Sequence, residues 1–455
     1  MEAEKIGIPS VTVAATSFLS LFRNLAESEG MPGLRAAEYP GTLGVESAET
    51  IRERFKQKTF DFIVEALTKP LEKVETEIRV QKPRDIVFTG TLEEVNSLFH
   101  MNRWTDGLAI IPPTIERVEE FLKYCDVSPH EEICVLPAAR LGATPWNIAV
   151  NGVMAGCRPE HMPVLIAAVE AMGDPTFNLE QIGTTGGVNL FFVVNGPIIK
   201  QLGLEYGQGL ISRGANPVIG RALGLVRNNI AGFRPGEQYA GTFGYILPYV
   251  LAEDEDEIYE MGWVPYHVEQ GYDRNTSTVT AGGSNSWGNQ TFPSGTDAEG
   301  LLKILARNII EHHALGVLPK WGPMGMQSVM VTPSVAKIIA HAYSKQDVKR
   351  YLQEHAKITV GEYELGIKYG DASGGGMTIA QQVERGELPK DWLKLGPLDD
   401  AGPVLSTPDM IHIFVCGDRT RNKGQAGYSW YNTTRTKPIR PPASWNKQLA
   451  EIGKK

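Results

Sequence analysis

Residues 1–30, MEAEKIGIPSVTVAATSFLSLFRNLAESEG, decide the fold that we expect for the N-terminal part of the chain. Residues 9–15 predict a strand, and residues 16–28 predict an amphipathic helix that Gly30 can end in the left-handed conformation. Residues 34–41, LRAAEYPG, predict a second strand. The pattern is therefore half of a βαβ unit, and we expect a small parallel-sheet domain of flavodoxin- or Rossmann-like type, incomplete as it stands.

The rest of the chain predicts a larger, mixed α/β domain. A helix over residues 49–71 is followed by a charged segment, so we place the domain boundary after residue 85 and the larger domain over residues 86–455. Residues 273–293, DRNTSTVTAGGSNSWGNQTFP, are poor in aliphatic side chains, and we expect them to form a lid-like surface loop over a cleft. The chain is thus an α/β protein with a partial first domain.

Composition excludes several classes of protein. The 455 residues carry a formal net charge of −9, which argues against a nucleic-acid partner. No run of eighteen apolar residues exists, and acidic residues near the start argue against a secretory signal, so we expect a cytoplasmic protein without a membrane partner. The four cysteines are scattered without CxxC pairs and predict reduced thiols.

Cys157 is the first candidate for chemistry, because AGCRPEH places it directly before a predicted helix. The unpaired N–H groups of that helix and the neighbouring Arg158 would stabilise a thiolate, which predicts a pKa below the usual value for a thiol. His161, one turn later, is a candidate proton carrier. The alternative is that Cys157 packs as a small apolar residue in a tight turn between helices.

A second set of residues predicts an anion site. In SRGANPVIGRALG, Asn216 is expected to cap a helix, with Arg213 just before it and Arg221 one turn inside, so that backbone N–H groups and guanidinium groups could converge on a carboxylate or phosphate. IGTTGGVNLFFVVNGP adds polar groups at the ends of an apolar strand, and these are Thr184, Thr185 and Asn195.

Two charged runs remain open. The acidic run over residues 253–257, EDEDE, is expected to be a solvated turn, because it lacks the alternating spacing of a metal-binding loop. The apolar run MIHIFVCGD predicts a buried strand. It is followed by a segment up to residue 442 that holds six basic residues, which either bind an anion or lie solvated.

Several blocks of the sequence resemble the long form of the UGSC-motif (seleno)protein family. They are GIPSVTVAATSF, GMPGLR, WTDGLAIIPPT, AVNGVMAGCRPEHMPV, NGPI, ANPVIGRALGL, PSVAKIIAHAYSKQDVKRYL and IFVCGD. The family is named for a Sec/Cys-Gly-Ser-Cys motif that follows its first strand. The resemblance implies thiol or selenol chemistry in an α/β protein, and it identifies neither the substrate nor a cofactor.

The motif itself is missing from this sequence. We expect a separate small subunit to carry the Cys/Sec motif, to place its strand beside residues 9–15 and to form an oligomer with this chain. Alternatively, a UGA codon was read as a stop, or the protein works without the motif.

These observations predict the large component of a thiol- or selenol-type enzyme, an oxidoreductase or a lyase that acts on a small anionic organic molecule. Cys157 and His161 would be its catalytic residues, and the anion-site residues would hold the substrate. The alternatives are a metal-dependent lyase or hydratase and a non-catalytic ligand-binding subunit.

Overall fold

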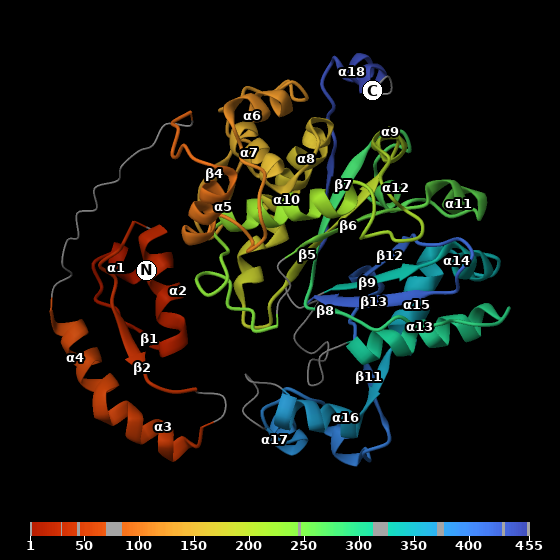
Figure 1. The fold of residues 1–455 in the computed structure, drawn as a ribbon. Helices are drawn as coiled ribbons and strands as arrows, with labels where there is room; N and C mark the ends of the chain where they lie inside the picture. The colour runs from red at the N-terminus through yellow and green to blue at the C-terminus, as the bar shows by residue number, and fades with distance from the viewer. Residues whose placement is uncertain are drawn as a thin grey trace.

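The computed structural model describes the chain in eight segments, which are residues 2–28, 30–42, 46–69, 84–243, 247–312, 326–370, 377–429 and 433–452. Within these segments the protein is a mixed α/β fold, as expected (Figure 1). The charged segment that we took as the domain boundary falls largely on residues 70–83, outside the described residues.

The N-terminal unit, residues 2–69, contains the predicted strand–helix–strand arrangement. Its two strands pair in parallel, with Thr12 opposite Ala36, and among the described strands each has only the other as a neighbour. Its elements are α1 (Glu2–Lys5), β1 (Thr12–Ala15), α2 (Leu19–Ser28), β2 (Ala36–Tyr39), α3 (Ala48–Arg54) and α4 (Phe60–Thr68), with a π-turn between the last two.

The described residues of the larger part form two four-stranded sheets. The first has the order β14-β7-β5-β6, and the second has the order β12-β9-β13-β8. Their bounds are β5 (Asn189–Asn195), β6 (Tyr249–Ala252), β7 (Thr278–Ser284), β8 (Ser286–Trp287), β9 (Met326–Val331), β12 (Ile411–Val415), β13 (Gly424–Ser429) and β14 (Arg435–Pro438).

The two sheets repeat one pattern. In the first sheet, β5 pairs in parallel with β6 on one side and antiparallel with β7 on the other. In the second sheet, β9 pairs in parallel with β12 on one side and antiparallel with β13 on the other. Each sheet is completed by a strand from the other half of the chain, because β14 pairs with β7 and β8 pairs with β13. The larger part is therefore built from two similar halves that exchange their edge strands.

The sheets pack face to face between two layers of helices. Phe191 and Phe414 meet between the sheets with ring centroids 6.1 Å apart, in a buried cluster that includes residues from both parallel pairs. On the outer faces α8 (Met162–Met172) and α10 (Asn216–Asn229) cover the first sheet, and α13 (Ala298–His312) and α15 (Lys345–His355) cover the second (Figure 1). Burial on both faces explains why β5 is a continuous apolar run between two asparagines.

The remaining elements surround these layers. They are α5 (Leu92–Met101), α6 (Ile115–Leu122), β3 (Cys134–Leu136), β4 (Leu141–Ala143), α7 (Pro145–Ala155), α9 (Ile198–Leu202), α11 (Glu255–Glu260), α12 (Tyr266–Glu269), α14 (Pro333–Ala340), β10 (Lys357–Thr359), α16 (Val360–Leu365), α17 (Ile379–Glu384), β11 (Asp400–Pro403) and α18 (Trp445–Ile452). No helix in the described segments has the length and apolar character needed to span a membrane.

The expectation of a lid-like loop over residues 273–293 is wrong. This segment contains β7, which is buried along its whole length between β5 and β14. Its small residues fit the crowded interior, since a Cβ atom on Gly282 would lie 2.3 Å from the Phe191 ring across the β5–β7 ladder. Packing between layers, rather than exposure to solvent, accounts for the lack of large aliphatic side chains here.

Candidate functional site

Cys157 is a buried residue that does not have the predicted low pKa. It follows Gly156, which ends α7 in the left-handed conformation, and its Sγ donates a hydrogen bond to the Val218 carbonyl oxygen at 3.2 Å. Burial raises the pKa of the Cys157 thiol well above its usual range, and the opposing field of Arg221 is the weaker effect. The prediction that a helix N-terminus activates this thiol is therefore wrong, because desolvation outweighs it.

His161 is buried and uncharged. Its Nδ1 accepts a hydrogen bond from the Arg158 N–H at 3.2 Å, and burial, aided by the Arg158 charge, lowers its pKa to about 3. The Arg158 guanidinium itself pairs with Glu160 at 3.0 Å. The geometry around Cys157 and His161 is that of a packed turn between helices.

The residues predicted to bind an anion do not come together. Thr184 and Thr185 precede β5, whereas Asn195 ends it, so about 20 Å of strand separates the two groups. Asn195 is fully buried and donates hydrogen bonds to Glu253 and Glu255, two carboxylates rather than an anionic ligand.

Asn216 and Arg221 have structural partners. Ala215 occupies the N-cap position that we predicted for Asn216, which is the first residue of α10 instead. Its side chain donates to the carbonyl oxygens of residues 205, 210 and 250 and accepts the N–H of residue 205. Arg221 donates two hydrogen bonds to Asp106, at 2.8 and 3.0 Å, and Arg213 is exposed near Glu205. The predicted anion site is therefore wrong, because Asn195, Asn216 and Arg221 are each hydrogen-bonded to other groups of the protein.

The structure instead contains a cavity of about 340 Å³ at the carboxyl ends of β9 and β12, the position where α/β sheets commonly bind ligands. We call it the Cys416 cavity. Three segments that are distant in the sequence line it, together with Gln290. They are residues 207–212, residues 330–332 and, from the loop after β12, residues 416–418, 421 and 423–425.

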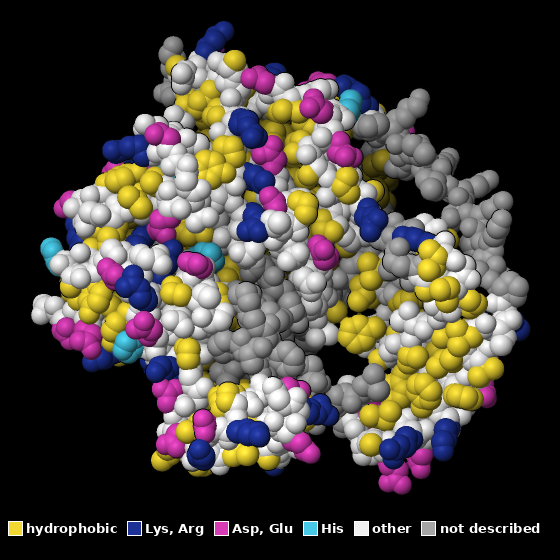
Figure 2. All heavy atoms as spheres, turned by 180° about the vertical axis from the view of Figure 1, so that it is seen from behind, with side chains coloured by type: hydrophobic (Ala, Val, Ile, Leu, Met, Phe, Trp, Pro, Cys, Tyr) yellow, Lys and Arg dark blue, Asp and Glu magenta, His cyan; other side chains and the backbone are white. Residues whose placement is uncertain are grey.

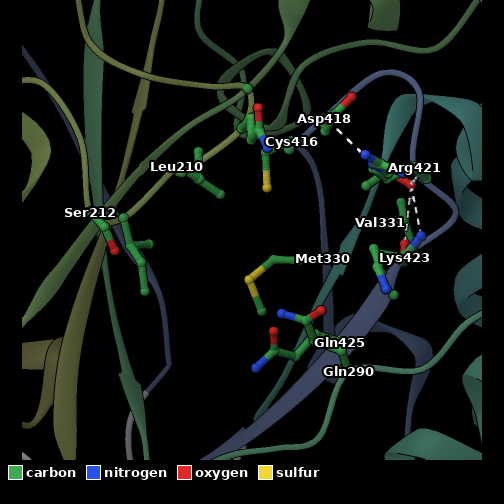
Figure 3. A pocket seen from close by; sticks show the side chains of 17 residues that line it. Leu210, Ser212, Gln290, Met330, Val331, Cys416, Asp418, Arg421, Lys423 and Gln425 are labelled. Atoms are coloured by element: carbon green, nitrogen blue, oxygen red, sulfur yellow. Dashed lines mark hydrogen bonds and ion pairs between the residues drawn. The ribbon is translucent and has the colours of Figure 1, made fainter.

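Cys416 is the residue that directly follows β12, and its sulfur points into this cavity (Figure 3). Its N–H donates to the Val331 carbonyl oxygen, and Gly417 then turns the chain at a φ of 95°, which favours glycine. Burial raises the pKa of the Cys416 thiol above its usual range, and Glu253 and Asp254 raise it further. The resting thiol is therefore protonated.

Basic and apolar side chains share the cavity wall. Arg421 and Lys423 come from the basic segment after β12, and Lys423 Nζ lies 3.3 Å from the centre of the Phe292 ring. The Arg421 carbonyl accepts a 2.5 Å hydrogen bond from the Thr332 hydroxyl, which fixes this loop to the end of β9. Met330 and Leu210 add apolar surface to the lining of the cavity (Figure 3).

The acidic run 253–257 is not the solvated turn that we expected, because its first two carboxylates are buried. Glu253 accepts hydrogen bonds from the Asn195 side chain and from the N–H groups of Tyr266 and Val415. Asp254 forms a bidentate pair with Arg419, both distances being 2.7 Å. Within the described residues, no three histidine, cysteine or acidic side chains are grouped as a metal site requires.

Comparison with known protein families matches the N-terminal unit. The UGSC family model matches residues 1–69, which is the N-terminal unit with β1 and β2. No curated protein and no solved structure matches the chain. The resemblance noted in the sequence is thus confirmed over residues 1–69, the part of the chain that the family model matches.

Proposed function

We propose that the chain is the large component of a thiol- or selenol-dependent enzyme, an oxidoreductase or a lyase, and that its substrate is a small organic anion bound in the Cys416 cavity. The observation that carries the proposal is the position of the Cys416 sulfur, which faces a cavity with Arg421 and Lys423 on its wall. Cys416 takes the role first expected of Cys157.

The lining of the cavity supports an anionic substrate of modest size. A volume of about 340 Å³ is suited to a small organic molecule. The Arg421 and Lys423 charges attract a carboxylate or a phosphate, while Met330 and Leu210 favour an apolar portion on the same molecule. Asp418, which is 3.8 Å from Arg421, offsets part of this positive charge.

Thiol chemistry in this cavity needs a proton acceptor, because a protonated thiol is a weak nucleophile. Glu253 is suited to this role, since one of its oxygens is hydrogen-bonded to the N–H of Val415, the residue before Cys416. Burial raises the pKa of Glu253 above its ordinary value, so its carboxylate is a better base than an exposed one. In the proposed step the S–H bond of Cys416 breaks and its proton moves to the Glu253 carboxylate, which leaves a thiolate facing the bound molecule.

A second sulfur or selenium would come from a small subunit that carries the UGSC motif. Two features support a partner at the N-terminal unit: β1 has one free edge among the described strands, and apolar side chains are exposed on this unit (Figure 2). These exposed side chains are Ile6, Ile8, Val13, Phe18, Phe60, Phe62, Val64 and Leu67.

Calorimetric titration with a panel of small carboxylates and phosphate esters tests the proposal, with Cys416→Ser and Cys157→Ser as a matched pair. Both thiols are buried, and only Cys416 lines the cavity. Turnover should be lost in Cys416→Ser and retained in Cys157→Ser. Binding without turnover in the wild-type protein would favour the ligand-binding subunit instead, and dependence on a stoichiometric metal would favour the lyase or hydratase alternative.

A further inference from the structure

Asn216, the first residue of α10, uses its whole side-chain amide to hold the chain segment that precedes this helix. The side chain is fully buried. Its Oδ1 accepts the Glu205 N–H at 3.0 Å. Its Nδ2 lies 2.9 Å from the carbonyl oxygens of Glu205 and Leu210 and 3.2 Å from that of Val250 in β6. Because carbonyl oxygens only accept, these contacts fix the orientation of the amide. Asn216 therefore joins residues 205–210 to the first sheet.

The segment that Asn216 holds forms one wall of the Cys416 cavity. Residues 207–212, which we call the wall loop, all line this cavity. The two aliphatic side chains of the wall loop pack against the buried cluster that contains Cys416. Directly before the loop, the Tyr206 carbonyl oxygen accepts the Gly417 N–H at 2.7 Å. The wall loop is thus connected both to the cavity and to the turn that follows the thiol.

Few other hydrogen bonds hold the wall loop. The chain turns at Gly209, where a φ of 80° favours glycine, and the Ser212 N–H closes this turn on the Gly209 carbonyl oxygen. Within the described part of the chain, the hydrogen bond that joins the wall loop to another element is the one between Asn216 and the Leu210 carbonyl oxygen. The position of the loop therefore depends strongly on Asn216.

Movement of the wall loop would change the surroundings of the thiol. Cys416 is only 4% exposed, and burial is the main reason for the raised pKa of its thiol. A displaced loop would admit water and small molecules to the sulfur, and hydration favours the thiolate over the thiol. Both effects would make Cys416 react faster with an added electrophile.

We propose that Asn216 is a positioning residue of the Cys416 cavity, which holds the wall loop against the thiol and so limits the access of small molecules to it. The inference rests on the proposed function, in which the substrate binds in this cavity. Asn216 acts through the loop, because its own side chain is not part of the cavity lining. The remainder of α10 is held by buried apolar side chains that do not depend on this amide.

The test is alkylation of the full chain with iodoacetamide at pH 8, followed by mass spectrometry, in the wild type, Asn216→Ala and Asn151→Ala. Asn151 is the matched control, because it is also buried, while its hydrogen-bond partners are in α7 and at the end of α10 rather than in the wall loop. Cys134, in β3, is the internal reference. We expect Asn216→Ala to raise the rate at Cys416 relative to Cys134 about tenfold, and Asn151→Ala to leave this ratio unchanged.

An unchanged ratio in Asn216→Ala would overturn the proposal. The same rise in both variants would also overturn it, because general destabilisation would then explain the effect. Asn216→Ser keeps one hydrogen-bond donor and should give a smaller rise than Asn216→Ala. If neither variant at Asn216 folds, this residue supports the whole fold rather than the loop, and the proposal is wrong. The assay needs no substrate, so it decides the role of Asn216 even if the wild-type protein binds no anion and the proposed function fails.

Discussion

Glu253 and Cys416 occupy equivalent positions in the two halves of the larger part, since each directly follows the second strand of a parallel pair. Val194 lies opposite Ala252 at the end of one pair, and Val331 lies opposite Val415 at the end of the other. The Glu253 carboxylate reaches across to accept the Val415 N–H at 3.1 Å. The repeated topology thus places a buried carboxylate beside a buried thiol.

Glu253→Gln should make Cys416 react faster with iodoacetamide at pH 8, because the variant removes a negative charge that raises the pKa of the thiol. Mass spectrometry of the modified peptide measures the rate. Glu255→Gln is the matched control, since Glu255 lies in the same run and does not contribute to that shift. If the two variants react alike, the coupling between Glu253 and Cys416 is absent.

Asp106→Asn should lower the free energy of unfolding by about 3 kcal/mol, because it breaks a buried ion pair and leaves the Arg221 charge uncompensated. Burial alone would raise the pKa of Asp106, but Arg221 outweighs it and the pKa is lowered. This contribution is therefore complete above the ordinary aspartate pKa of about 3.9 and is lost as the pH falls below it. Urea unfolding at pH 7 and pH 3 measures both effects. If Asp106→Asn lowers the free energy of unfolding by the same amount at pH 3 as at pH 7, the ion pair with Arg221 does not make this contribution.

His412 should make the protein less stable as the pH falls from about 6.5 towards 3. It lies buried beside the Tyr266 hydroxyl, at 2.8 Å, and burial lowers its pKa to about 3, so only the unfolded chain binds a proton in this range. The slope that it adds is about 1.4 kcal/mol per pH unit. His412→Asn keeps an acceptor for Tyr266 and should remove this part of the slope in urea unfolding. An unchanged slope would show that His412 is protonated in the folded state.

Gly282→Ala should destabilise the protein by about 2 kcal/mol or more, since the new methyl group would overlap the Phe191 ring between β5 and β7. Gly207→Ala is the control, because no atom lies within 4 Å of the place that its new methyl group would take, and its φ is not positive. Thermal unfolding should show a large fall in Tm for the first variant and little change for the second. Equal effects would mean that β7 does not pack as described.

Local signals in the sequence predicted much of the secondary structure. The apolar runs of β5 and β12 are strands, and residues 9–41 form the predicted strand–helix–strand arrangement. The segment containing β7 was misjudged because its small and polar residues suit the contact between layers, which local composition does not reveal.

The candidate site could not be found from local patterns, because its parts meet only in the folded chain. Arg221 looked like an anion ligand until its partner Asp106, 115 residues earlier, was placed beside it. Cys416 carried a weaker signal, a cysteine followed by glycine after a buried strand and then by basic residues. Its sheet position, the neighbouring Glu253 and the cavity all depend on long-range topology.

The most direct test of the proposed site is alkylation of the four cysteines, followed by mass spectrometry, with and without a saturating small organic anion from the titration panel. The account predicts that the anion protects Cys416 and leaves Cys125, Cys134 and Cys157 unchanged, because only Cys416 lines the cavity with Arg421 and Lys423. Protection of another cysteine, or an anion that binds tightly without slowing the reaction of Cys416, would contradict it.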